Sequence, residues 1–182
     1  PDPVGDVGPN HYVEMINLVF AVYSKTGELL LGPVDTGTLW AGFSVPDCTD
    51  PSGDPIVLYD QFADRWILSQ FTTRGLDDPS LPFYNCVAIS QTGDPTGAYY
   101  RYAFTTGLNF PDYPKYGVWR DSYITQVGRL RAGPDGNLAT GADNINCLIM
   151  IDAGQWGQDF NTLSLHAQQV LDRAHGQPRA AA

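Results

Sequence analysis

The residues best suited to bind a ligand lie together in the segment 111–121. We expect it to be a proline-stiffened connection between two sheets, and it holds the aromatic residues Tyr113 and Trp119 and the cations Lys115 and Arg120. Flat aromatic rings beside cations and carboxylates suit a sugar or a peptide. These four residues, together with Arg65, are the candidate ligand-binding residues. The alternative is that Tyr113 and Trp119 pack between sheets while Lys115 pairs with a neighbouring aspartate.

No catalytic residue is predicted, because the chain lacks the nucleophile elbow, the zinc-protease motif, the P-loop and the dinucleotide fingerprint. Paired carboxylates of the kind that glycosidases use occur at Asp60/Asp64 and Asp77/Asp78. Aspartates in turns, however, usually accept hydrogen bonds from their own backbone two residues on. This structural turn role is expected for Asp6, Asp60, Asp94 and Asp121.

The acidic loop 47–54 is the best candidate for a metal site. Asp47, Asp50 and Asp54 fall within eight residues, and Ca²⁺ favours oxygen-rich loops. The loop lacks the spacing of an EF-hand, so no cofactor is assigned. Calcium at these three carboxylates stays an alternative.

The composition predicts a turn-rich, soluble β domain. The 182 residues carry 20 acidic side chains against 10 Lys and Arg, with 19 Gly and 14 Pro. Asp, Gly and Pro oppose helix interiors, which argues against a helical bundle. A hydrophobic fraction of 43% argues against disorder, and the net charge of −10 argues against nucleic acid as a partner.

A repeated segment suggests how the strands are organised. An aspartate followed five residues later by His or Arg, then by an aromatic residue, occurs at Asp6 to Tyr12 and again at Asp60 to Trp66. A shortened third copy ends at Tyr123, so the aromatic residues are 54 and 57 residues apart. Near-equal periods of this length are typical of repeated sheets such as propeller blades.

We therefore expect an all-β fold of repeated antiparallel sheets, propeller-like, with about three blades in an incomplete ring. Residues 1–160 form this domain, in units at about 1–50, 51–110 and 111–157. Apolar residues at helical spacing predict a short helix at 162–175, within a tail 161–182 whose end frays. A propeller usually needs about four to eight blades to close, so further blades of the same or another chain are expected partners.

The cysteines indicate whether the protein belongs in an oxidising compartment. Cys48 and Cys86 are a plausible disulfide in an oxidising compartment, which leaves Cys147 single. The alternative is three buried thiols that pack as small hydrophobic side chains. No apolar run reaches the roughly 18–20 residues needed to span a bilayer.

Six segments carry a resemblance to known proteins: 5–13, 54–60, 64–66, 69–71, 90–97 and 112–119, the last being Asp112-Tyr113-Pro114-Lys115-Tyr116-Gly117-Val118-Trp119. Together they resemble a family of large secreted bacterial proteins of largely unassigned function. The amino-terminal half of that family is a propeller-like β domain. Residues 90–99 also resemble the Asp-box hairpin of sialidase-like propellers. The resemblance implies a secreted, extracellular location and repeated sheets, and it carries over no catalytic residues.

Two functions fit these observations. The first is a non-catalytic extracellular scaffold or binding module whose partner is a glycan or a protein. The alternative is a sialidase-like glycoside hydrolase fragment that uses Asp carboxylates. Two carboxylates about 5–9 Å apart in one pocket would favour the hydrolase.

Overall fold

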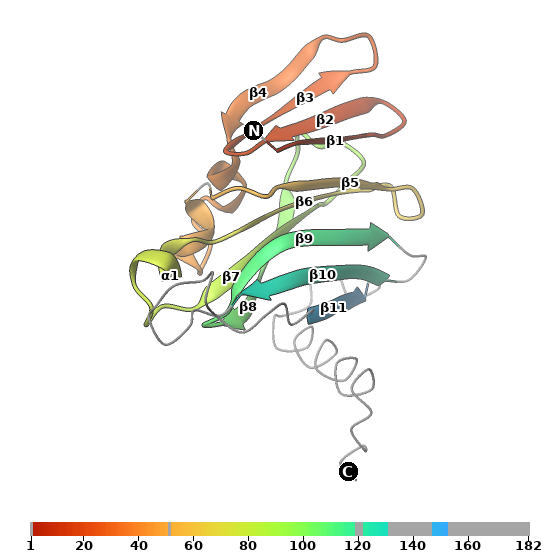
Figure 1. Cartoon of the computed structure of the whole chain (residues 1–182). Helices are drawn as coiled ribbons and strands as arrows, with labels where there is room; N and C mark the ends of the chain where they lie inside the picture. The colour runs from red at the N-terminus through yellow and green to blue at the C-terminus, as the bar shows by residue number, and fades with distance from the viewer. Residues whose placement is uncertain (1, 51, 119–121, 131–146, 153–182) are drawn as a thin grey trace.

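The structure is a computed structural model that describes residues 2–50, 52–118, 122–130 and 147–152 (Figure 1). The strands are β1 (Pro3–Val7), β2 (His11–Ile16), β3 (Val19–Ser24), β4 (Leu29–Asp35), β5 (Ile56–Asp60), β6 (Arg65–Phe71), β7 (Phe83–Ser90), β8 (Tyr99–Gly107), β9 (Phe110–Val118), β10 (Ser122–Leu130) and β11 (Cys147–Asp152). The helical turns are η1 (Thr36–Trp40), η2 (Pro46–Thr49) and α1 (Arg74–Asp77). The predicted helix at 162–175, and Trp119, Arg120 and Asp121, lie outside the described residues.

The strands form three antiparallel sheets that follow one another in chain order. The sheet orders are β1-β2-β3-β4, β5-β6-β7-β8 and β11-β10-β9. Figure 1 shows them one below the other, with β5 between β1 and β9. The expected all-β class is confirmed. Among the described residues no helix is long and apolar enough to cross a membrane.

One expectation about the candidate segment is wrong. Residues 111–121 were expected as a proline-stiffened connection, but residues 110–118 form strand β9. β9 is an edge strand of its sheet, so a proline there need not break a ladder hydrogen bond to a second neighbour. Pro111 and Pro114 are tolerated for this reason.

The β5–β8 sheet buries apolar side chains on both of its faces. Along β6, Trp66 and Leu68 pack with Val13 and Met15 of the first sheet, while Ile67 packs on the opposite side with Tyr123 of the third. Successive side chains of a strand point to opposite faces. A strand covered on both sides is therefore apolar at every position, as the run 86–89 of β7 is.

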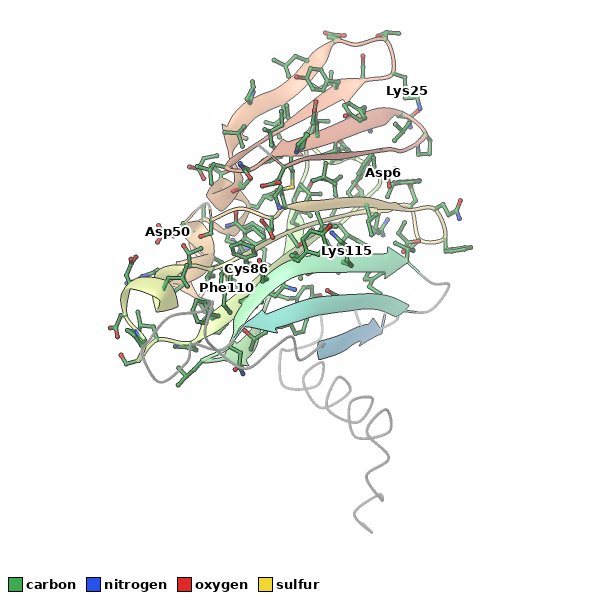
Figure 2. All side chains as sticks on the ribbon, in the orientation of Figure 1. Asp6, Lys25, Asp50, Cys86, Phe110 and Lys115 are labelled. Atoms are coloured by element: carbon green, nitrogen blue, oxygen red, sulfur yellow. A yellow bond between two sulfur atoms is a disulfide. The ribbon has the colours of Figure 1, made fainter. Side chains whose placement is uncertain are left out.

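Asp6, in β1, and Asp60, the last residue of β5, join each sheet to the next. The backbone N–H of Tyr59 in β5 donates to Asp6 Oδ2 at 2.7 Å, and Figure 2 shows Asp6 beside β5. The Tyr123 hydroxyl in β10 donates to Asp60 Oδ2 at 2.6 Å. The two aspartates, 54 residues apart in the sequence, thus each accept a hydrogen bond from the following sheet, Asp6 from a backbone N–H and Asp60 from a side-chain hydroxyl.

The connection between the first two sheets, residues 36–55, is fixed onto the β5–β8 sheet from within. The buried Gln70 side chain accepts a hydrogen bond from Thr36 and donates to the carbonyl oxygens of Cys48 and Asp50. A disulfide joins Cys48 to Cys86 of β7, and both residues are fully buried. The connection therefore reaches β5 along a fixed path.

We predict that replacing both cysteines, Cys48→Ala and Cys86→Ala, lowers the free energy of unfolding by about 4 kcal/mol. The bond closes a loop with a sequence separation of 38, and closing a loop of that size restricts the unfolded chain by about this amount. Urea unfolding monitored by tryptophan fluorescence measures the change. The reduced wild-type protein is the matched control and should lose similar stability; an unchanged midpoint in both would contradict the prediction.

Candidate functional site

A pocket of about 270 Å³ lies beside the starts of β1 and β5 and the middle of β9. Three dipeptides line it, one from each sheet: Asp2-Pro3, Asp54-Pro55 and Tyr113-Pro114. The residues that follow or adjoin them, Val4, Ile56 and Lys115, complete the wall. The pocket is therefore built from one residue–proline pair within or just before the first strand of each sheet.

The residue before each proline has a left-handed backbone. The φ angles are 35° at Asp2, 42° at Asp54 and 54° at Tyr113. Left-handed backbone costs a residue with a Cβ roughly 1–2 kcal/mol. Such strain persists where the surrounding structure enforces it, and it clusters at functional sites. Its occurrence in all three sheets at one pocket marks this place as the strongest site candidate.

A β-bulge positions Tyr113 in the third sheet. Asp112 pairs with Gly128 of β10 and Lys115 pairs with Gln126, so the register shifts by one residue between them. Bulges redirect side chains and are common beside functional sites. The Tyr113 side chain is turned outward and is 68% exposed.

The charged groups of the pocket are predominantly acidic. Asp54 Oδ2 accepts a hydrogen bond from the backbone N–H of Tyr113 at 3.3 Å. Burial raises the pKa of the Asp54 carboxyl, and the negative charges of Asp112 and Asp2 raise it further. The hydrogen bond from Tyr113 and the charge of Lys115 act in the opposite direction. The pocket thus offers carboxylate acceptors together with one ammonium donor.

Tyr113 and Lys115 lie together, as a joint binding role requires. The Lys115 ammonium is 3.6 Å from the centroid of the Tyr113 ring, a cation–π contact. The alternative that Tyr113 packs between sheets is excluded by its exposure. Figure 2 shows Lys115 on β9, toward the middle of the molecule.

The third candidate that the structure describes, Arg65, lies elsewhere. It pairs with Asp60 where β5 ends, whereas the pocket adjoins Ile56 where β5 begins. At roughly 3.3 Å per residue, a five-residue strand separates the two places by more than 10 Å. The Arg65 guanidinium donates to the carbonyl oxygens of Ala63 and Asp64, so it supports its own turn.

Two of the three aspartates of the proposed calcium loop, Asp47 and Asp54, have separate partners. Asp47 forms an ion pair with Arg74 at 2.8 Å, and Asp54 faces the pocket. The part of the chain that the structure describes contains no group of three or more His, Cys, Asp or Glu side chains that could hold a metal ion.

The remaining turn aspartates accept hydrogen bonds locally. Asp94 Oδ1 accepts from the backbone N–H and the hydroxyl of Thr96, and these bonds lower the pKa of the Asp94 carboxyl. Asp60 Oδ1 accepts from the backbone of Phe62 and Ala63. These contacts are the Asx type that short polar side chains make in turns.

A second hollow, of about 610 Å³, lies between the outer strands of the first two sheets. Its wall is mainly apolar, with Phe20 and Val34 on one side and Tyr99 on the other. Arg101, its one charged residue, is held by the carbonyl oxygen of Ala41 and the ring of Phe43. Its lining residues include no carboxylate, in contrast to those of the first pocket.

Sequence reasoning found Tyr113 and Lys115 but missed the Asp2 and Asp54 side of the pocket. The available signal was the dipeptide Asp-Pro, which occurs at 2–3 and at 54–55. Comparison of the chain with family models, curated proteins and solved structures finds no match.

We predict that Tyr113→Gly is more stable than Tyr113→Ala by about 1 kcal/mol, because glycine adopts positive φ without a Cβ clash. Chemical unfolding of the two variants measures the difference. Leu108 is the control position, since it is exposed and is absent from the positive-φ residues. There the alanine variant should be the more stable one. The same order at both positions would refute the strained backbone at Tyr113.

We predict that Asp54→Asn is more stable than the wild type at neutral pH. Because the folded-state pKa of Asp54 is raised above 3.8, ionising the carboxyl opposes folding. That penalty is absent below pH 3.8 and sets in as the pH rises through the folded-state pKa. The difference in free energy of unfolding should therefore vanish in acid.

Asp78→Asn is the control with the opposite sign. Hydrogen bonds from the Ser80 hydroxyl and backbone lower the pKa of the Asp78 carboxyl. Its contribution to stability is present above the ordinary pKa and is lost as the pH falls. Urea unfolding over a pH series compares the two variants, and parallel pH profiles for both would contradict the assignment.

Proposed function

We propose that this chain is an extracellular propeller-type module that binds a neutral glycan at the pocket beside Tyr113. The observation that carries the proposal is the convergence of Asp54, Tyr113 and Lys115 at one strained pocket. Sugar hydroxyls donate to carboxylates and accept from an ammonium group, and an exposed aromatic ring offers a flat apolar contact. A non-catalytic binding or scaffold role follows from this chemistry.

The charge of the pocket supports a neutral ligand over an anionic one. The negative charges of Asp2 and Asp112 both raise the pKa of the Asp54 carboxyl, and Lys115 is the one cation among the residues that line the pocket. An acidic sugar would therefore meet net repulsion, as would nucleic acid. A protein partner would need a basic or polar segment to fit the same site.

The propeller architecture is part of this proposal. Three successive antiparallel sheets, with inner strands β1, β5 and β9 next to one another, support it. The resemblance of the sequence to large secreted bacterial proteins also supports a secreted origin. The disulfide between Cys48 and Cys86 is compatible with an oxidising, extracellular setting.

A glycoside hydrolase of the sialidase-like type is the second candidate. One observation favours it, namely that burial raises the pKa of the Asp54 carboxyl in a pocket that other carboxylates adjoin. A carboxyl group with a raised pKa suits a general acid. Turnover of a bound oligosaccharide would distinguish this role from binding alone.

We predict that the protein retains neutral glycans on an array and that Tyr113→Gly and Lys115→Ala each weaken binding about tenfold, the size expected for losing one aromatic or cation contact. Calorimetry with the best array ligand measures the loss. Lys25→Ala is the matched control, because Lys25 lies in the turn between β3 and β4, away from Lys115 (Figure 2). Release of new reducing ends would favour the hydrolase, and failure to bind any neutral glycan would refute the proposal.

A further inference from the structure

The hollow between the outer strands of the first two sheets, here called the outer hollow, has the size and the wall of a small-molecule site. Its volume is about 610 Å³, and it shares no lining residue with the pocket beside Tyr113. Small organic molecules bind in hollows of roughly 300–1,000 Å³ whose walls are mainly apolar and carry a few polar groups. The wall of the outer hollow includes Phe20, Leu31, Val34, Leu39, Tyr99 and Arg101.

The first sheet supplies an apolar wall. Phe20 in β3 is opposite Val34 in β4, so the two side chains share one face of the sheet. This face packs on Trp66 of the second sheet. Leu31 of β4 and Leu39 of η1 adjoin Phe20 and Val34 in the wall. A ligand on this side of the hollow would therefore meet hydrocarbon.

The second sheet supplies an aromatic ring and a cation. Tyr99 and Arg101 are two residues apart in β8, so their side chains lie on the same face. The Tyr99 hydroxyl donates to the carbonyl oxygen of Pro95 at 2.6 Å, and the Thr38 hydroxyl donates to that of Asp35 at 2.6 Å. Because both hydroxyl protons are already used, the wall offers the Tyr99 ring as apolar surface.

The Arg101 guanidinium is held in place without a carboxylate. One of its nitrogen atoms donates to the carbonyl oxygen of Ala41 at 2.7 Å, and the group lies 5.7 Å from the centroid of the Phe43 ring. Among the described residues no carboxylate forms an ion pair with Arg101. A guanidinium has several N–H donors, and a single bond to Ala41 leaves others for an anion. Gln91 adds an exposed side chain to the same wall.

The charge of the wall selects the ligand. The chain carries a net charge of −10, yet the lining of the outer hollow holds one arginine and no carboxylate. A carboxylate has one negative charge and matches the guanidinium with two parallel hydrogen bonds. A phosphate monoester carries about two negative charges at neutral pH, which a single arginine in an acidic protein does not neutralise. The wall therefore fits an apolar molecule that carries one carboxylate.

We propose that the outer hollow binds a small apolar carboxylic acid. The carboxylate lies on the Arg101 guanidinium, and the hydrocarbon part lies against Phe20, Val34 and the Tyr99 ring. The ligand contacts both the first and the second sheet, so its binding stabilises their packing. This site is separate from the proposed glycan pocket and does not rest on it.

Isothermal titration calorimetry with decanoate, below the concentration at which it forms micelles, tests the proposal. We expect a single saturable site on each chain. Arg101→Met should weaken decanoate binding about tenfold or more, the size expected for losing a hydrogen-bonded charge pair, and should leave the binding of decanol unchanged. Arg101→Lys keeps the charge and should retain part of the affinity. Lys25→Met is the matched control, since Lys25 is exposed and does not line the hollow; it should bind decanoate as the wild type does.

A second variant tests the hollow itself. Ala98 is exposed and lines the hollow, so Ala98→Trp should fill it and weaken decanoate and decanol alike. Circular dichroism establishes that each variant is folded. Failure to bind decanoate would overturn the proposal, as would binding at many sites on each chain or an affinity that survives both Arg101→Met and Ala98→Trp. An apolar peptide with blocked ends that binds more tightly than decanoate would also overturn it, in favour of a protein partner.

The Tyr113→Gly variant separates this site from the glycan pocket. It should bind decanoate with wild-type affinity, because the two sites share no lining residue. Loss of decanoate binding in Tyr113→Gly would contradict the placement in the outer hollow. A wild-type protein that binds decanoate but no neutral glycan supports this inference and refutes the proposed glycan ligand alone.

Discussion

The β5–β8 sheet must bury both of its faces, and the rest of the structure depends on this constraint. Its strand β6 carries Trp66 and Leu68 toward one neighbour and Ile67 toward the other. A sheet that is apolar on both sides is stable in water only between two others. The first and third sheets are therefore held against it, and the turn carboxylates of Asp6 and Asp60 set how each pair aligns.

The pocket is a consequence of that stacking. When the three sheets align through their first strands, the starts of β1 and β5 and the middle of β9 come together at one place. The connection 36–55 arrives there along a path fixed by Gln70 and the disulfide, which helps to hold Asp54 in its strained backbone. The packing of the sheets thus offsets the conformational cost of the left-handed backbone at Asp54 and Tyr113. The side chains of the site are therefore positioned before a ligand binds.

The sequence predicted the all-β class and the proximity of Tyr113 and Lys115, because both follow from local patterns: turn residues, period-two alternation and two side chains two residues apart. It did not predict that Asp54 would join them, since that requires knowing which strand ends meet in space. Arg65 was grouped with Tyr113 and Lys115 for the same reason. The sequence does not show that Arg65 lies where β5 ends, whereas the pocket adjoins the start of β5. Strand β9 was read as a connection because its prolines oppose strands in general, though not at a sheet edge.

The outer strand β4 is protected against pairing with further strands. It is an edge of its sheet and carries the run Leu29, Leu30 and Leu31, a sequence that in a regular edge strand would recruit further strands and seed fibrils. Pro33 has no backbone N–H to offer, and the pairing of β3 with β4 is interrupted by two register shifts. Growth of the sheet by strand addition is thereby blocked. The leucine-rich edge of the first sheet is thus kept from acting as a template for another chain.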